Sequence, residues 1–381
     1  MSYTFVDTQE AFELLIGKLR SKKYIAIDTE SNSLFAYQGS LCLLQLAAEN
    51  IRVIVDTLKV DITSFEILLV DKDIEKIFHS AEADIKTLKL AFKTNIHNIF
   101  DVMLSAKYMG IRKCGLDGMV GEYFDVKLNK KFQKANWGAR PLSKEMLDYA
   151  INDVRYLKKL RDIFHLKLKK AYLLNEITEE FVKLTKLEPQ GPKFDRNGYL
   201  SYGLSRKLNM LSLAVLKELY CAREKAAAKL NVPSFKVISE DLMLRLSKGP
   251  EHALMSLVEY KGITKYVYTL HGEWIREAIK RGLKEKTVTI PKKVAISKEK
   301  LEHYHNVKDR IKKLKRWRIE TAKKRNMLSE VIIEGETLEK IAYRNPKNVD
   351  DLIKIEGFLP IKSSMYGKEI LDVLSTEEKL F

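Results

Sequence analysis

The order of apolar patterns along the chain constrains the fold more than any other feature. In the first part of the 381 residues, short runs of branched apolar residues alternate with segments of helical periodicity. The predicted strands are Tyr24–Asp28, Leu41–Ala47, Arg52–Asp56, Lys76–His79 and Ile96–Asp101. The predicted helices are Gln9–Lys18, Glu82–Phe92, Leu116–Phe124 and Lys144–Lys169. Three adjacent strands followed by alternating strands and helices indicate a mixed sheet covered by helices, an α/β domain.

Beyond residue 170 the strand pattern fades, and helical periodicity dominates. Residues 188–207 begin with a stretch rich in Pro, Gly and Asn and are predicted to be a linker after an α/β domain at 1–187. A shift of 95 residues then aligns Arg223 with Arg318, Asn231 with Asn326 and Gly262 with Gly357, among other identities. Chance identity between two Lys-rich helical stretches is the alternative to a duplication. We favour duplication and expect two all-α modules, at 208–286 and 297–376.

The net charge of +17 is unusual and unevenly distributed. Residues 1–200 contain 31 Lys and Arg against 27 Asp and Glu, whereas residues 201–381 contain 37 against 24. Much of the excess lies between Lys280 and Arg325. Such a basic region attracts polyanions, of which nucleic acid is the commonest, although a solvated Lys-rich surface would give the same count.

The three cysteines, Cys42, Cys114 and Cys221, lie far apart, with no paired or zinc-finger spacing. This excludes a disulfide framework and a structural zinc site, and it fits a reducing compartment. The amino terminus lacks the apolar run of a secretory signal, and no stretch reaches the length of a membrane span. We therefore expect a cytoplasmic protein that does not associate with a membrane.

An acidic pair follows the first predicted strand. Alternate side chains of a strand face the same side, so Asp28 and Glu30 point in one direction. Carboxylate oxygens bind Mg²⁺ or Mn²⁺, and such ions assist phosphodiester hydrolysis. The spacing alone is weak, because Asp71 and Asp73 share it. An acidic pair where an apolar strand ends nevertheless favours a paired or metal-bound site.

A second signal lies where the fourth predicted strand passes into a helix. Asp84 would fall in the first helical turn and could be a third ligand, while His79 or Ser80 could touch a substrate. The alternative is local: Ser80 would cap the helix and Asp84 would complement its dipole.

A third signal lies on the long helix predicted at Lys144–Lys169. Tyr149 and Asp153 are four residues apart and share a helix face, so a phenol and a carboxylate would point together. The same spacing occurs at Tyr3 and Asp7, and a solvated Asp beside a half-buried Tyr is the default interpretation.

The loop before that helix contains Trp137 and Arg140 near Lys131 and Lys134. Trp137 could stack on a base with Arg140 on a phosphate. It could equally fix the loop to the core.

In this order within one α/β domain, these signals form a specific pattern. The chain resembles the DEDD superfamily of 3′→5′ exonucleases, in its DEDDy branch, and most closely the ribonuclease D family. The runs Leu41–Ala47 and Arg140–Ala150 match as well. Residues 208–286 and 297–376 each resemble the HRDC module, a helical nucleic-acid-binding domain. The resemblance implies a ribonuclease H-like mixed sheet followed by two HRDC-like domains.

The resemblance also implies a mechanism. Asp28, Glu30, Asp84 and Asp153 would bind two divalent metal ions, Mg²⁺ or Mn²⁺, with Asp28 bridging, and Tyr149 would orient the attacking water. The substrate contacts would come from Gln45, His79, Trp137 and Arg140. The expected protein is a monomeric exoribonuclease acting on RNA, with tRNA precursors as the expected substrate. A DNA exonuclease and a nucleic-acid-binding scaffold with an inactive nuclease domain are the competing interpretations.

Overall fold

The computed structural model describes residues 2–189, 194–285 and 298–376. Its amino-terminal part is built on one mixed sheet of six strands in the order β1-β4-β3-β2-β5-β6. The central strands β2, β3 and β4 are antiparallel neighbours, whereas β1, β5 and β6 join by parallel pairing. The strands are β1 (Thr4–Val6), β2 (Tyr24–Ser31), β3 (Leu41–Ala48), β4 (Ile51–Asp56), β5 (Glu75–Phe78) and β6 (Ile99–Asp101).

Helices cover both faces of this sheet, because its central strands are apolar on both sides. One face packs against α1 (Gln9–Leu19), α2 (Glu66–Val70) and α3 (Glu82–Phe92). The other face packs against α4 (Val102–Tyr108), α5 (Leu116–Phe124), α6 (Lys144–Arg155), α7 (Leu157–Lys170) and α8 (Leu174–Thr185). The predicted α/β class is confirmed.

The remaining helices form two modules with the same sequence of long and short elements. The first contains α9 (Met210–Leu230), α10 (Ser234–Val237), α11 (Glu240–Lys248), α12 (Pro250–Met255) and α13 (Lys265–Lys284). The second contains α14 (Lys298–Lys324), α15 (Ser329–Ile332), α16 (Gly335–Arg344), α17 (Val349–Ile353) and α18 (Pro360–Ser375).

The two modules support the predicted duplication. Three helices of the first module begin at Ser234, Glu240 and Lys265, and their counterparts begin 95 residues later. The aligned residues Asn231 and Asn326 both have left-handed backbone conformations, with φ of 49° and 52°. Asn tolerates this conformation where a helix ends, which explains why both copies keep it.

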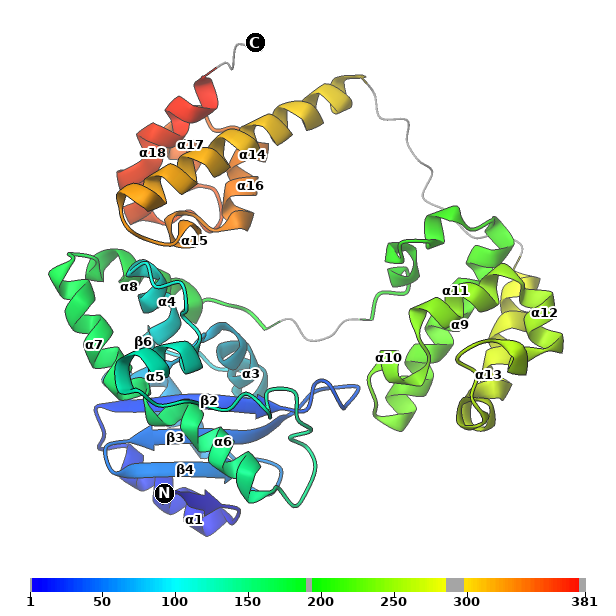
Figure 1. The fold of residues 1–381 in the computed structure, drawn as a ribbon, viewed down its shortest axis with the longest axis horizontal. Coiled ribbons are helices and arrows are strands. Elements are labelled where there is room, and N and C mark those ends of the chain that lie inside the picture. Colours follow the sequence, from blue (N-terminus) through cyan, green and yellow to red (C-terminus); the bar gives the residue numbers. More distant parts are fainter. Residues whose placement is uncertain (1, 190–193, 286–297, 377–381) are drawn as a thin grey trace.

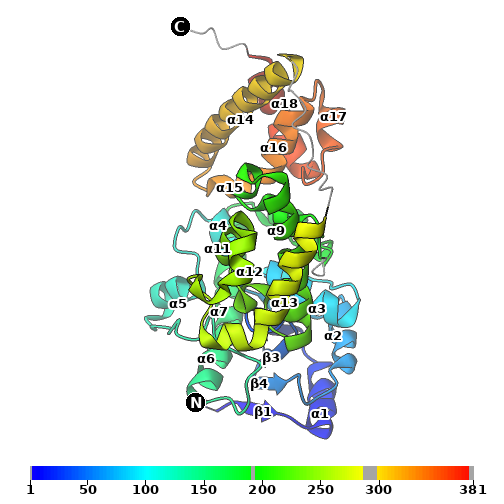
Figure 2. The same ribbon diagram turned by 90° about the vertical axis from the view of Figure 1, so that its right-hand side faces the viewer.

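The modules are attached to the sheet domain in different ways (Figures 1 and 2). The second module packs on α4 and α8 and shares one continuous apolar core with them. The first module has its own core and meets the loop after β2, where the Tyr37 amide donates to Asn231. Among the described helices, none is both long enough and apolar enough to span a membrane.

The structure differs from the sequence prediction in a few segments. The linker predicted at 188–207 includes residues 190–193, which lie outside the described residues. The later part of it packs on the first module, because Tyr199 is 2% exposed within that module's core. The helix predicted at Lys144–Lys169 is two helices, which meet at Tyr156. The short elements β1, α2 and α4 were not predicted, nor was α8.

Candidate active site

Two acidic side chains project from the central strand β2. Asp28 is paired in register with Gln45 of β3, and Glu30 is paired with Leu43. The register shifts between Glu30 and Ser31, so regular pairing ends just after the acidic pair. Asp28 and Glu30 therefore lie at the end of the strand on the face that α6 covers.

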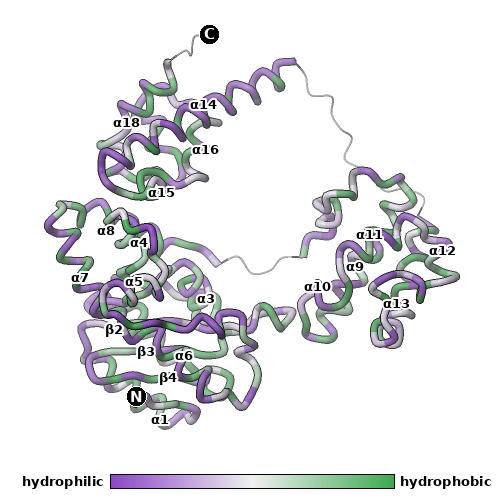
Figure 3. Tube along the Cα trace, viewed as in Figure 1, coloured by the Kyte–Doolittle hydropathy of each residue, from purple (hydrophilic) through white to green (hydrophobic). Residues whose placement is uncertain are grey.

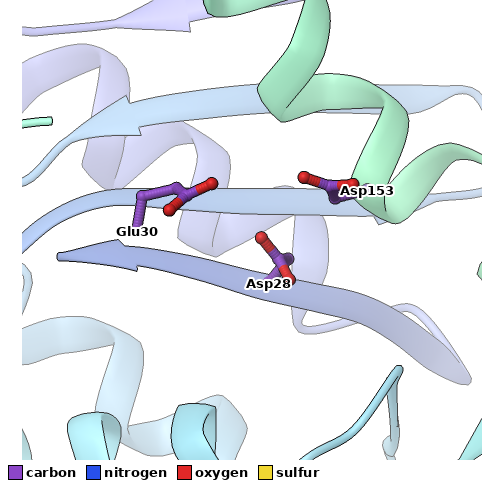
Figure 4. Close-up of side chains that lie close together, drawn as sticks. All are labelled: Asp28, Glu30 and Asp153. Atoms are coloured by element: carbon purple, nitrogen blue, oxygen red, sulfur yellow. The ribbon is translucent and has the colours of Figure 1, made fainter. Parts of the chain in front are cut away.

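Helix α6 supplies the third carboxylate. Ser143 caps the helix through its side chain, which accepts from the Met146 amide. Ala150, Ile151 and Val154 are buried against the sheet, which fixes the face on which Asp153 lies. Carboxylate oxygens of Asp28, Glu30 and Asp153 lie within 4.8 Å of one another, and Figure 4 shows them directed toward a common space.

Asp84 joins this cluster from the other side of β2. It lies in the first turn of α3, is 7% exposed, and accepts a hydrogen bond of 2.6 Å from the Thr29 hydroxyl. Thr29 lies between Asp28 and Glu30, so this bond holds Asp84 at the same strand end. The structure thus brings three of the four predicted carboxylates within 4.8 Å of one another, and Asp84 lies near enough for its charge to raise the pKa of Asp28.

The turn before α3 is fixed by a residue that the sequence analysis did not single out. The Asp101 carboxylate accepts from the amides of Ser80 and Ala81, at 3.2 and 2.8 Å, and also from Leu104 at the start of α4. Ser80 has a left-handed backbone with φ of 63°. Ser80 does not cap α3, so the capping alternative is wrong for Ser80. The only sequence signal for Asp101 was its place at the end of a strand.

The four carboxylates lie in an environment that disfavours negative charge. Burial, and then the nearby carboxylates of Asp84, Asp153 and Glu30, raise the pKa of Asp28 well above its usual range. Burial first, with Asp153 and Asp84 adding to it, raises the pKa of Glu30 to about 9. Burial is also the largest cause that raises the pKa of Asp84 and of Asp153, each to about 7. Within the described residues, the ion pairs involve none of these four acids. A cluster of this kind is stabilised by cations.

Tyr149 lies on α6 one turn before Asp153. Its ring packs between those of Trp137 and Phe132, with centroid separations of 5.9 Å to each. Burial, and then the charges of Asp153, Glu30 and Asp28, raise the pKa of Tyr149. The phenol is therefore neutral at any ordinary pH and remains a hydrogen-bond donor beside the carboxylates.

Two of the predicted substrate contacts, Trp137 and Arg140, are engaged by other residues of the fold. Trp137 is 1% exposed, and its ring supports Tyr149. The Arg140 guanidinium pairs with the fully buried Asp56, at 2.6 and 2.7 Å, and also donates to the Trp137 carbonyl. These contacts favour the other interpretation of this loop, while substrate contacts by Trp137 and Arg140 stay predictions. The loop is fixed to the core, which was the alternative.

Gln45 and His79 are the other two predicted contacts. Gln45 is fully buried beside Asp28, and its contact to substrate stays a prediction. His79 is half-buried, and its Nε2 donates to the Cys114 carbonyl at 2.9 Å. His79 therefore stays a predicted substrate contact, through the part of the ring that does not bond to Cys114.

The chain is similar to known proteins in both the sheet domain and the second helical module. Residues 3–169 match a family model described as 3′-5′ exonuclease, and residues 307–374 match the HRDC domain. The ribonuclease D of Desulfotalea psychrophila is 29% identical over 293 residues, which are 75% of this chain and 77% of that one. The human exosome complex component 10 is 28% identical over 253 residues, which are 64% of this chain and 29% of that one.

Two solved structures share the fold. The Escherichia coli RNase D structure covers 98% of this chain and 99% of that one, with a TM-score of 0.71 and 19% identity. The catalytic core of RRP6 from Trypanosoma brucei covers 75% of this chain and 81% of that one, with a TM-score of 0.67 and 26% identity. The predicted resemblance to the exonuclease family is confirmed.

Proposed function

We propose that this chain, in which residues 3–169 are a 3′-5′ exonuclease domain and residues 307–374 an HRDC domain, removes nucleotides one at a time from RNA 3′ ends. The products would be nucleoside 5′-monophosphates. The observation that carries the proposal is the convergence of Asp28, Glu30 and Asp153 within 4.8 Å beside Tyr149. Similarity to proteins named ribonuclease D supports RNA as the substrate.

The donor chemistry of the cluster fits divalent metal ions. Its members are oxygen ligands only, and mutual repulsion with burial keeps their pKa values high in the absence of a cation. Asp28, Glu30, Asp84 and Asp153 would hold two ions, Mg²⁺ or Mn²⁺. Bound there, such ions neutralise the phosphate and make a water molecule more acidic.

The side chains themselves have distinct tasks. Asp28 would be the central ligand of the metal site, because the charges of Asp84, Asp153 and Glu30 all act on its carboxylate. Thr29 holds Asp84 in position through its hydroxyl. Tyr149 stays protonated and orients the attacking water by hydrogen bonding, while Trp137 and Phe132 hold its ring.

The natural substrate is proposed to be a structured RNA 3′ end such as that of a tRNA precursor. The Escherichia coli protein of the same fold is described as an exoribonuclease involved in structured RNA processing. The basic helical half would hold the RNA by its phosphates, and the chain would act as a monomer. The cytoplasmic location stays a prediction.

One digest tests the reaction, the sugar and the metal together. RNA and DNA oligomers of the same sequence, labelled at either end, are incubated with the full chain in Mg²⁺, Mn²⁺ or EDTA. We expect stepwise shortening of 5′-labelled RNA with either metal and none in EDTA. Preferential shortening of DNA would favour a DNA exonuclease, and no hydrolysis of either polymer would favour a binding scaffold.

A further inference from the structure

The positive charge of the second module is concentrated on one helix. Helix α14 contains 11 Lys and Arg against four Asp and Glu. The rest of that module, residues 325–376, contains seven against nine. The hydropathy colouring shows the same contrast, with α14 strongly hydrophilic along most of its length (Figure 3). The site that attracts a polyanion is therefore this helix and not the module in general.

The basic side chains of α14 form a stripe. Tyr304, Lys308, Lys312 and Lys315 are exposed and lie within about 80° of one another at 100° per residue. The four acids of the helix, in contrast, point about 140° or more away from Tyr304. They are Glu299, Glu302, Asp309 and Glu320. The face of α14 from Tyr304 to Lys312 thus presents positive charge, and the acids, which are also exposed, lie beside or behind it, with Asp309 about 60° from Lys312.

An open aromatic groove lies at one end of this stripe. It has a volume of about 440 Å³ and is lined by Glu299, Lys300, His303, Tyr304, Val307 and Tyr343. Tyr304 is 57% exposed and Tyr343 is 63% exposed. The His303 and Tyr343 rings meet edge to face at 5.5 Å, and the Lys308 ammonium lies 5.7 Å from the centre of the Tyr304 ring. Exposed aromatic rings beside a basic stripe are the combination that single-stranded nucleic acid binds.

We infer that the Tyr304–Tyr343 groove and the lysine stripe of α14 are a binding site for single-stranded RNA, with an unstacked base in the groove and phosphates along Lys308, Lys312 and Lys315. This inference rests on the proposed function, because the bound strand would be the upstream part of the RNA whose 3′ end is hydrolysed. A duplex would fit less well, since its bases are stacked and paired and leave no ring for the groove.

The second module is fixed to the exonuclease domain by contacts close to α14. The Leu328 amide donates to the Lys107 carbonyl of α4, and Arg325 pairs with Glu176 of α8. These contacts flank the carboxyl end of α14 and hold the helix in a fixed direction on the catalytic domain (Figure 1). RNA bound to α14 would therefore remain attached between successive cleavages. This retention would speed the degradation of RNA long enough to reach α14 and would not affect shorter RNA.

The test measures RNA binding without hydrolysis. A fluorescent 24-nucleotide single strand and a hairpin duplex are titrated with the full chain in EDTA. The double variant Tyr304→Ala/Tyr343→Ala should bind the single strand about tenfold more weakly and the duplex as wild type does. The matched Tyr304→Phe/Tyr343→Phe variant keeps both rings and should bind the single strand normally. Unchanged single-strand affinity in the alanine variant, or an equal loss on the duplex, would overturn the inference.

The role of the lysine stripe is tested with a matched control variant in the same module. Replacement of Lys308, Lys312 and Lys315 by Gln should reduce the dependence of log K on log salt by about 2. The control replaces the exposed Lys347, Lys354 and Lys368 by Gln, which removes the same charge, and should change the slope by much less. Equal slopes in the two triple variants would contradict the assigned stripe. A wild-type chain that binds no RNA would instead refute the proposed function itself.

Discussion

Among the described residues, two clusters of buried or half-buried carboxylates differ in their partners. At the junction between α8 and the second module, Glu176 accepts two hydrogen bonds from Arg325, at 3.1 and 2.8 Å, and Glu180 pairs with Lys362. Lys362 is 3% exposed and also donates to the Val331 carbonyl. In the catalytic cluster, Asp28 is surrounded by other carboxylates, and these raise its pKa.

The difference in partners distinguishes acids that stabilise the fold from acids that are suited to bind a cation. A buried carboxylate beside a buried cation is already neutralised, and it fixes one element against another. Half-buried carboxylates that meet only other carboxylates are unfavourable as anions until a cation arrives from solution. The junction acids therefore hold the second module in place, and the acids around Asp28 are the proposed site for cations from solution.

Removing an acid from each cluster should lower the activity in one case and leave it nearly unchanged in the other. We expect Asp28→Asn to lower the rate of RNA hydrolysis in Mg²⁺ by at least about a thousandfold, because the central ligand of the proposed metal site is lost. The junction variant Glu176→Gln should stay within a few-fold of wild type. Initial rates on a labelled oligomer, under conditions where both variants are folded, give the comparison. Near-normal activity of Asp28→Asn would remove the basis for the metal site.

Stability should show the reverse pattern. Glu180→Ala leaves the Lys362 ammonium buried without its carboxylate partner and should lower the free energy of unfolding by about 3–5 kcal/mol. Urea unfolding of the full chain measures the loss. The double variant Glu180→Leu/Lys362→Met removes both charges and should recover most of it. A loss below about 1 kcal/mol in the single variant would mean that this pair does not hold the junction.

Tyr149→Phe should affect the chemical step alone. The ring and its packing on Trp137 and Phe132 remain, but the hydroxyl that orients water is absent. We expect kcat to fall about a hundredfold with little change in KM. Steady-state kinetics separates the two constants. An unchanged kcat would assign Tyr149 a structural role, like that of its aromatic neighbours.

The smallest expected effect concerns pH and the metal-free protein. Burial and Asp84 raise the pKa of Asp153 to about 7 in the folded chain, above its value when unfolded. The stability contributed by its protonated form is therefore complete at acid pH and is lost as the pH rises through about 7. At pH 8 in EDTA, Asp153→Asn should increase the free energy of unfolding by about 1–2 kcal/mol, with a smaller increase at pH 5.

Thermal unfolding in EDTA at the two pH values, with Asp73→Asn at an exposed acid as the control, measures this effect. Saturating Mn²⁺ should reverse the order, because only the wild-type chain keeps the full set of ligands. A metal-free Asp153→Asn chain that is less stable than wild type at pH 8 would contradict the account of an unpaired cluster.

The catalytic acids could be placed from the sequence because each lies at the end of a recognisable element. Asp28 and Glu30 end a strand, Asp84 begins a helix, and Asp153 shares a helix face with Tyr149. Local periodicity determines where such residues point, and the family pattern indicates that they meet. The α/β class followed from the same periodicity, whereas the two helical modules were predicted from residue identities at a shift of 95.

The partners of single polar residues could not be predicted in this way. Arg140 pairs with Asp56, which lies 84 residues earlier, and nothing local indicates that pair. Glu176 and Glu180 look in the sequence like ordinary acids of an exposed helix, but their partners are Arg325 and Lys362. Long-range contacts decide whether a charged side chain binds substrate or supports the fold, and only the folded structure contains them.

Binding of Mn²⁺ to the full chain, measured by calorimetry, tests the difference between the two clusters most directly. Wild type and the junction variant Glu176→Gln should each bind two ions per chain. Glu30→Gln should lose one of them or bind it at least about tenfold more weakly, because a ligand of the catalytic cluster is gone. If Glu30→Gln bound Mn²⁺ as wild type does, the carboxylates around Asp28 would not be the metal site.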